Sequence, residues 1–331
     1  MRTMARRYAW QIVPISCVIL AGRTGSATKL PASKNRVTRD PKPREHDDRS
    51  QHDVENRDDA AAPNPMTPDP AKVRIWDERA RAYDALCRRW NVFTLLSTRL
   101  IDMLPASLPG DVLDIGAGSG LTSELLLDRH PESRAILIEP AHGMVDVART
   151  HLAARPAQFL VMGLDGAPVR DLRAVAAIAS ASMQFLDFEP AFDVLSRVIE
   201  PGGHVAFNLW YHHWEETAGG EGMYGWIPIA EAVCREAGVE LAAPPARPVP
   251  KTRAQLTNAT RAHGFELLVE ERDHDLSPVS YGVDFMAMDR QWPAPGLEPS
   301  QRESMIRTMR ERAEGQVESL GSTRFLFGAP R

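Results

Sequence analysis

The segment Asp111-Val-Leu-Asp-Ile-Gly-Ala-Gly-Ser-Gly120 constrains the fold of this chain more than any other stretch. Its apolar run, Val112 to Ile115, is typical of a parallel strand that is covered on both faces. Glycines then follow at alternate positions: Gly116, Gly118 and Gly120. They allow a sharp turn and leave backbone N–H groups open to a ligand. Helical spacing begins at Leu121, so the pattern predicts a nucleotide-type ligand on a glycine loop at a helix N-terminus.

The next predicted strand places a carboxylate close to this loop. Residues 134–139 form an apolar run that ends in Glu139. This is about the distance downstream at which an acid meets a ribose in a strand-helix-strand unit. Glu139 is therefore predicted to accept the two ribose hydroxyls, and the alternative is a glutamate that merely ends a strand at the surface.

These features resemble those of the class I S-adenosylmethionine-dependent methyltransferases. The likeness is greatest to the small-molecule group that includes trans-aconitate and malonyl carrier-protein methyltransferases, and it covers about residues 72–331. Residues 113–120 match the family pattern acid-x-Gly-x-Gly-x-Gly. A dinucleotide-binding fingerprint would instead place a glycine where Leu121 stands.

Further matches follow in the order that the family shows. Residues 76–84 resemble its first helix, and residues 139–144 resemble the ribose acid and the segment that lines the adenine. Residues 195–203 are similar to its helix, Pro-Gly-Gly turn and fifth strand. Residues 324–328 look like its last strand, which is antiparallel and separates this topology from the all-parallel dehydrogenase sheet.

The resemblance implies an α/β fold, with a doubly wound, Rossmann-like, seven-stranded sheet whose last strand is antiparallel. The methyltransferase domain is expected to span residues 69–331. Helical substrate lids are expected after strand 5, at 211–263, and before strand 7, at 276–318. Strands are predicted at 111–115, 134–139, 157–162, 174–180, 203–210, 265–271 and 322–328.

The resemblance also implies that S-adenosylmethionine is the methyl donor. The positions that match its binding site are Tyr83, Asp114, Gly116, Ala117, Gly118, Gly120, Glu139, Pro140, Met144, Asp165 and Ser180. One of them departs from the family, because Asp165 lies one residue beyond the usual Gly-Asp-Ala acid. The adenine contact is left open between Asp165, the backbone and neither. Tyr83 has a second interpretation as a simple packing residue.

Candidates for acceptor chemistry follow the fourth and fifth strands. His212 and His213 are predicted general bases for a phenol, alcohol or thiol, in an aromatic wall that runs from Trp210 to Trp214. The alternative is a pair of solvent-exposed or structural histidines. Gln184 replaces a residue of the family's His-Trp pair and is predicted to orient an acceptor by hydrogen bonds.

Charge and cysteine content exclude some classes of partner. The net charge of -5 argues against a nucleic-acid surface. The three cysteines are widely spaced, so neither a disulfide framework nor a zinc site is predicted, and the cytoplasm is the simplest compartment. We expect a small-molecule acceptor and no membrane contact, and the sequence allows a homodimer.

Residues 1–68 have a different composition. The chain has eight basic residues and no acid up to Arg39, and acids, prolines and alanines follow. The apolar run at 12–21 resembles part of a signal peptide but is too short to span a bilayer. We predict a disordered leader or a mis-assigned start, with Met66 as the natural first residue and a targeting peptide as the alternative.

The predicted function is transfer of a methyl group from S-adenosylmethionine to an oxygen or nitrogen of a small molecule, in biosynthesis. A carrier- or protein-bound acceptor is one alternative, and a non-catalytic protein that binds the donor is another. A nicotinamide-dependent oxidoreductase is a third, which the glycine spacing and the last strand disfavour.

Overall fold

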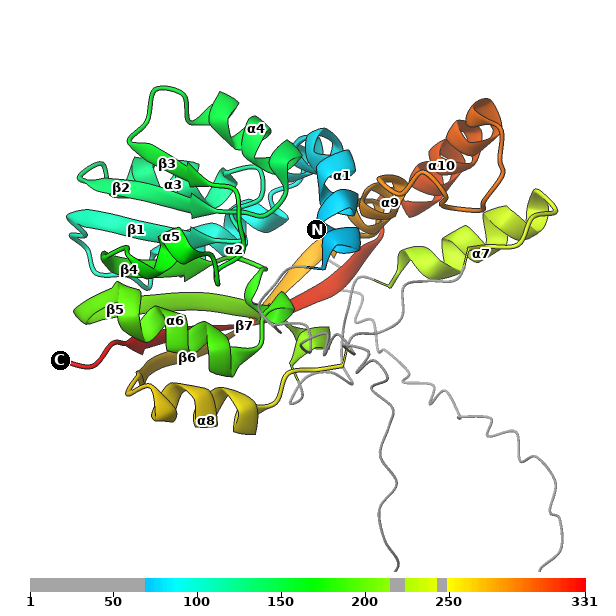
Figure 1. The fold of residues 1–331 in the computed structure, drawn as a ribbon. Helices are drawn as coiled ribbons and strands as arrows, with labels where there is room; N and C mark the ends of the chain where they lie inside the picture. The colour runs from blue at the N-terminus through cyan, green and yellow to red at the C-terminus, as the bar shows by residue number, and fades with distance from the viewer. Residues whose placement is uncertain (1–68, 215–223, 243–248) are drawn as a thin grey trace, which may run out of the picture. The chain divides into compact units, whose positions relative to one another are not determined.

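The computed structural model describes residues 69–214, 224–242 and 249–331 (Figure 1). The chain divides into two units, 1–59 and 60–331, and the described residues all belong to the second. The predicted leader at 1–68 lies outside the described residues. Within the described part, no helix combines the length and the apolarity needed to cross a bilayer.

A seven-stranded sheet forms the centre of the domain, in the order β3-β2-β1-β4-β5-β7-β6. The first five strands pair in parallel, whereas β7 pairs antiparallel with both neighbours. This confirms the predicted fold. The strands are β1 (Gly110–Ile115), β2 (Ser133–Ile138), β3 (Ala157–Leu160), β4 (Ala174–Ala179), β5 (Ile199–Trp210), β6 (Glu266–Pro278) and β7 (Val317–Gly328).

Strand β5 begins at Ile199 rather than at 203, and the last two strands also extend further than predicted. Their pairing runs from Glu266 opposite Gly328 to Pro278 opposite Val317. The added part of β6 reads as a charged loop in the sequence, but its acids have ionic partners: Arg324 Nε lies 2.6 Å from an oxygen of Asp273. Pairing of the charges allows a polar segment to continue the ladder, which the apolar pattern alone does not reveal.

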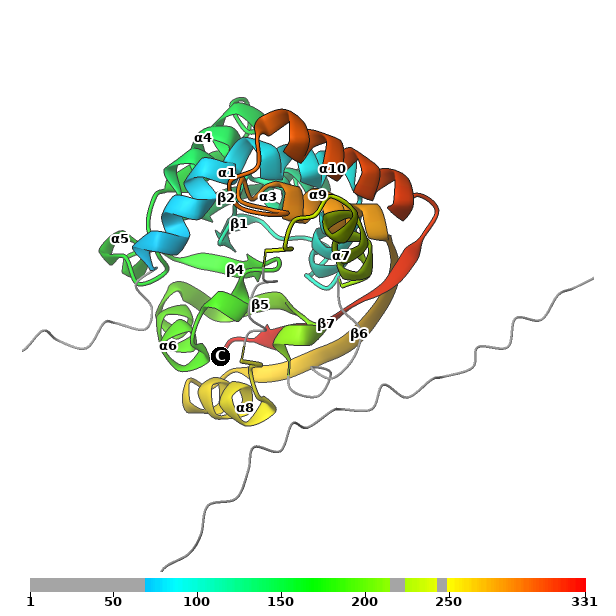
Figure 2. The same cartoon turned by 90° about the vertical axis from the view of Figure 1, so that its right-hand side faces the viewer.

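Helices cover both faces of the sheet, as a doubly wound fold requires (Figures 1 and 2). One face packs against α2, α3 and α4, and the other packs against α6 and α8. The helices are α1 (Pro70–Arg89), α2 (Val92–Ile101), α3 (Leu121–Arg129), α4 (His142–His151), α5 (Ala167–Arg170), α6 (Phe188–Val198), α7 (Trp226–Glu236), α8 (Arg253–Ala262), α9 (Val279–Ala287) and α10 (Pro299–Ala313).

Three helices pack around a second apolar core. Helix α10 packs against both α7 and α9, as Figure 2 also shows. Trp226, Val283 and Met309 are buried between them. Both predicted insertions contribute to this core, because α7 comes from 211–263 and the other two helices from 276–318. Helix α8 also lies in the first insertion, but it packs against α6 beside the sheet.

Candidate functional site

The glycine loop lies between β1 and α3, and its three glycines all have positive φ. Each serves a different purpose. A Cβ on Gly116 would lie 2.6 Å from the Cβ of Ser182, and one on Gly120 would lie 3.0 Å from the Cβ of Ala148. A Cβ on Gly118 would meet only an edge carbon of Tyr83, at 3.6 Å. Of the three glycines, Gly118 alone therefore leaves its space open to a ligand, whereas the other two are required by packing.

Glu139 lies directly beside this open position. Its Oε2 accepts a hydrogen bond from the backbone N of Gly118 at 3.0 Å, and its Oε1 accepts one from Ala141 N at 2.9 Å. Burial raises the pKa of Glu139, and the two backbone donors oppose that rise. The side chain is only 8% exposed. Its carboxylate is thus fixed against the loop, and each oxygen keeps capacity for a further donor.

Asp114 connects the two elements that flank the loop, β1 and α3. Its side chain is buried, and its Oδ2 accepts a hydrogen bond from Ser123 Oγ of α3 at 2.7 Å. Burial raises the pKa of this carboxyl to about 7, despite the opposing bond from Ser123. Asp114 therefore ties the end of β1 to the first turn of α3.

Helix α1 places Tyr83 against the loop. The ring makes edge contacts with Trp76 and Phe93, with centroids 5.4 Å apart in each pair. Burial raises the pKa of the hydroxyl well above its usual value. The helix is held in place by Asp77, whose Oδ1 accepts a hydrogen bond from Gly143 N of α4 at 2.7 Å. Tyr83 thus packs in an aromatic group and also borders Gly118.

The remaining residues that are predicted to bind the methyl donor differ in how far they are exposed to solvent. Ala117 and Met144 are buried, and Met144 packs with residues of α1. Ser180 accepts a hydrogen bond from Ser97 Oγ at 3.1 Å. Pro140 and Asp165 are half-buried, the latter in the turn after β3. Their contacts with a donor stay predictions.

Gln184 lies in a short 3-10 helix, Met183–Phe185, beyond the carboxyl end of β4, and Asn208 of β5, which was missed from the sequence, lies beside it. Gln184 Nε2 donates to the carbonyl of Ala181 at 2.7 Å, and Asn208 Oδ1 accepts from the backbone N of the same alanine at 2.7 Å. Asn208 could have been noticed as a lone polar side chain in the apolar run of β5. Ala181 itself has φ +53°, which no sequence pattern indicated.

The two histidines lie side by side, with ring centroids 4.4 Å apart. Burial lowers the pKa of His213 to about 4, and the neighbouring His212 and Lys251 add to that effect. Phe185 makes an edge contact with His213 at 6.2 Å. His213 is therefore neutral near pH 7, which a base requires, but its basicity is low.

The predicted aromatic wall from Trp210 to Trp214 is wrong. Trp214 is fully buried in the core between the sheet and α6, and its ring centroid lies 5.4 Å from that of Phe325. Trp210 belongs to a different cluster, with its ring 6.1 Å from that of Phe93. Successive residues beyond the end of β5 turn to different sides, so adjacency in sequence did not produce one surface.

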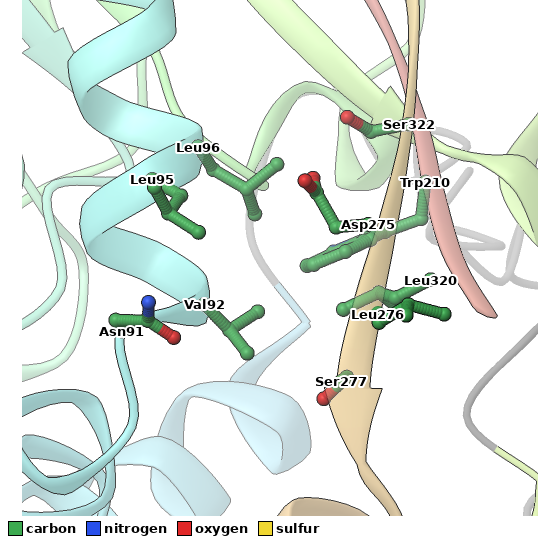
Figure 3. A pocket seen from close by; sticks show the side chains of 10 residues that line it. All are labelled: Asn91, Val92, Leu95, Leu96, Trp210, Asp275, Leu276, Ser277, Leu320 and Ser322. Atoms are coloured by element: carbon green, nitrogen blue, oxygen red, sulfur yellow. The ribbon is translucent and has the colours of Figure 1, made fainter. Parts of the chain in front are cut away.

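Trp210 also borders a small hollow beside α2 and the β6–β7 ladder (Figure 3). Its lining residues are Asn91, Val92, Leu95, Leu96, Trp210, Asp275, Leu276, Ser277, Leu320 and Ser322. The hydroxyls of Ser277 and Ser322 are buried there without a partner in the described part of the chain. The free volume is about 20 Å³, which suits a water molecule rather than a methyl acceptor.

Comparison with known proteins finds similarity to methyltransferases. Residues 112–203 match the family model described as a methyltransferase domain. The chain is 29% identical over 140 residues to a malonyl-[acyl-carrier protein] O-methyltransferase of Acetivibrio thermocellus, covering 41% of this chain and 48% of that protein. It is 31% identical over 112 residues to a trans-aconitate 2-methyltransferase of Methylobacterium nodulans, covering 33% and 42%.

The matched segments span about half the length of these curated relatives, or less. Among solved structures, the cyclopropane synthase MmaA2 from Mycobacterium tuberculosis superposes with a TM-score of 0.51 at 10% identity. That match covers 80% of this chain and 100% of the other. At this identity the likeness concerns the fold.

Proposed function

We propose that this chain, a member of the class I S-adenosylmethionine-dependent methyltransferase superfamily, transfers a methyl group to an oxygen or nitrogen of a small molecule. The observation that carries the proposal is the open position at Gly118, directly beside the fixed carboxylate of Glu139. Bare backbone and an adjacent carboxylate suit the two ends of a nucleoside that carries an amino acid. The donor fits these residues.

S-adenosylmethionine supplies an activated methyl group on a positively charged sulfur. An acceptor lone pair attacks the methyl carbon, the carbon–sulfur electron pair stays on sulfur, and the acceptor proton leaves to a base or to water. Glu139 would hold the ribose hydroxyls, and the loop around Gly118 would hold the methionine part. Tyr83 would close the side of the site and exclude water.

We propose that α7, α9 and α10 form the cover over the acceptor, because they share a core that is separate from the sheet. Helix α9 also joins α1, since Arg79 of α1 lies 2.8 Å from Asp289 just beyond α9. The cover and the helix that carries Tyr83 are thus in direct contact.

A carrier-bound acceptor is the second candidate, favoured by the names of several relatives. Radiolabelled S-adenosylmethionine offered with free small molecules and with an acylated carrier protein would separate the two candidates. We expect transfer to the free molecules. Label found only on the carrier protein would contradict the proposal, and absence of donor binding in calorimetry would contradict methyl transfer itself.

Glu139→Ala should weaken binding of S-adenosylhomocysteine by about 1.5–3 kcal/mol, because a charge-assisted contact to the ribose diol is lost. Isothermal titration calorimetry measures this loss. Glu132→Ala is the matched control, since Glu132 lies just before the same strand and also accepts a backbone N–H, from Leu108 at 2.8 Å. Equal affinities in both variants would remove Glu139 from the donor site.

His213→Ala tests the general base. If His213 takes the acceptor proton, the rate should fall by about 10²-fold, at the low end for such catalysis because the pKa lies far below neutrality. With a folded pKa of about 4, the rate of the parent enzyme should be flat above about pH 5. His263→Ala, directly after α8, serves as the control. Full activity of His213→Ala would exclude this base, and an inflection near pH 6.5 would point to another group.

A further inference from the structure

The segment just beyond β4 carries an unusual backbone conformation. Ala181 has φ +53°, a region that residues with a Cβ rarely adopt. Its neighbour Ser182 packs on Gly116 of the donor loop, and the Ser182 hydroxyl donates to the carbonyl of Ile115. The disfavoured conformation therefore lies at the donor site, where such strain is often functional.

Two side-chain amides each bond one backbone group of this residue. Asn208 accepts from its backbone N–H, and Gln184 donates to its carbonyl. The backbone partner fixes the orientation of each amide, because an N–H must face an oxygen and a carbonyl must face an N–H. Asn208 Nδ2 and Gln184 Oε1 are consequently the side-chain atoms that take no part in these two hydrogen bonds.

Both of these atoms are buried and have no hydrogen-bond partner among the described residues. Asn208 is 1% exposed and Gln184 is 7% exposed. One atom, Asn208 Nδ2, is a donor and the other, Gln184 Oε1, is an acceptor. Buried polar atoms are rarely left unsatisfied in folded proteins, so a ligand atom that accepts is expected at Asn208 Nδ2 and one that donates at Gln184 Oε1.

The surroundings indicate what else the ligand carries. Ala181 packs against an aromatic cluster that also contains Tyr83, Phe93 and Tyr281. The hydroxyl of Tyr281 is a further buried atom without a partner in the described part. Tyr83 and Phe285 are half-buried aromatic members of this cluster and offer ring surface to a ligand.

The arginines that border this cluster already have acidic partners. Arg310 Nε lies 2.6 Å from Asp284, which also pairs with Arg89 at 3.3 Å. Their charges are therefore committed to the protein. A carboxylate acceptor would have to be desolvated beside Gln184 Oε1, to which it has no proton to donate.

We infer that Asn208 and Gln184 recognise a neutral hydroxyl on an aromatic acceptor, with Asn208 Nδ2 donating a hydrogen bond to its oxygen and Gln184 Oε1 accepting a hydrogen bond from its O–H. This inference rests on the proposed function and names its substrate class. The hydroxyl oxygen is held at the end of β4 beside Gly116 and Tyr83. A phenol fits, whereas a carboxylate, the form that a carboxylic acid takes near pH 7, does not.

The test uses two probes that share a ring and differ in charge near neutral pH, 2-naphthol and 2-naphthoate. Each is titrated into the full chain saturated with S-adenosylhomocysteine. We expect 2-naphthol to bind at least about tenfold more tightly. Equal affinity, a preference for 2-naphthoate, or no binding of either probe would overturn the inference. Binding of S-adenosylhomocysteine is measured first, and its failure would instead contradict the proposed function.

Gln184→Met tests the amide itself. The variant should bind 2-naphthol about tenfold less tightly, so that its preference for 2-naphthol over 2-naphthoate is lost. Its affinity for S-adenosylhomocysteine should be unchanged. If Gln184 has only a structural role, the variant should bind both probes more weakly to the same extent, or should bind S-adenosylhomocysteine more weakly. Gln316→Met is the matched control, because Gln316 Nε2 also donates to a backbone carbonyl, that of Arg312, at 2.6 Å on an exposed surface. An unchanged preference in Gln184→Met would overturn the assignment.

Discussion

Gly118→Val is expected to weaken binding of S-adenosylmethionine by roughly 100-fold or more, while the sheet still folds. The valine would place its branched side chain in the space that the loop leaves open beside Glu139. Its first neighbour at Cβ is the edge of Tyr83, at an ordinary contact distance of 3.6 Å. The cost therefore falls mainly on the ligand, apart from backbone strain at φ +54°.

Gly202→Val separates the strain from the steric effect. Gly202 also has positive φ, at +77°, but a Cβ there meets nothing within 4 Å. Calorimetry should find unchanged donor affinity in Gly202→Val, and thermal unfolding should find a similar loss of stability in both variants. Normal donor affinity in Gly118→Val would show that the methionine part lies elsewhere.

Asp114→Asn is expected to stabilise the protein above neutral pH. The folded-state pKa is about 7 against an ordinary 3.8, so burial disfavours the charged form. The penalty is absent below about pH 4, grows as the pH rises and is complete above about pH 7, where it reaches about 4 kcal/mol. Asparagine carries no charge, and its side-chain oxygen can still accept from Ser123.

Urea unfolding of both proteins between about pH 4 and pH 8 measures this difference. The two free energies of unfolding should coincide at the acid end and diverge toward the alkaline end. Asp111→Asn is the control on the same strand, because Asp111 is more exposed and has Arg134 as an ionic partner. A difference that does not change with pH would show that Asp114 does not titrate in this range.

Much of the fold was predictable because its signals are local. Buried strands appear as apolar runs, and the loop appears as alternate glycines before a helical period. The same locality placed Glu139 at the end of β2, next to the loop. What failed was the length of β6 and β7, because the charges at Asp273 and Asp275 look like loop until Arg324 and Arg99 are seen beside them.

The glycine loop and its neighbour Glu139 were predictable from the sequence, whereas the arrangement of residues beyond β4 and β5 was not. Donor residues follow motifs with fixed spacing. The proposed acceptor side combines residues beyond β4, on β5 and in the insertions, which are distant in sequence. Asn208 was therefore missed, and Trp214 was assigned to a surface although it is 0% exposed.

The sequence by itself determined the order of strands and helices and the carboxylate beside the loop, since these depend on residues near one another in the chain. Only the tertiary structure decided the purpose of each glycine, because contacts with Ser182 and Ala148 come from other elements. It also decided that Asn208 and Gln184 bond the backbone of Ala181, while Asn208 Nδ2 and Gln184 Oε1 have no hydrogen-bond partner among the described residues. Hydrogen-bond satisfaction and packing are properties of neighbours in space, and no periodicity along the chain records them.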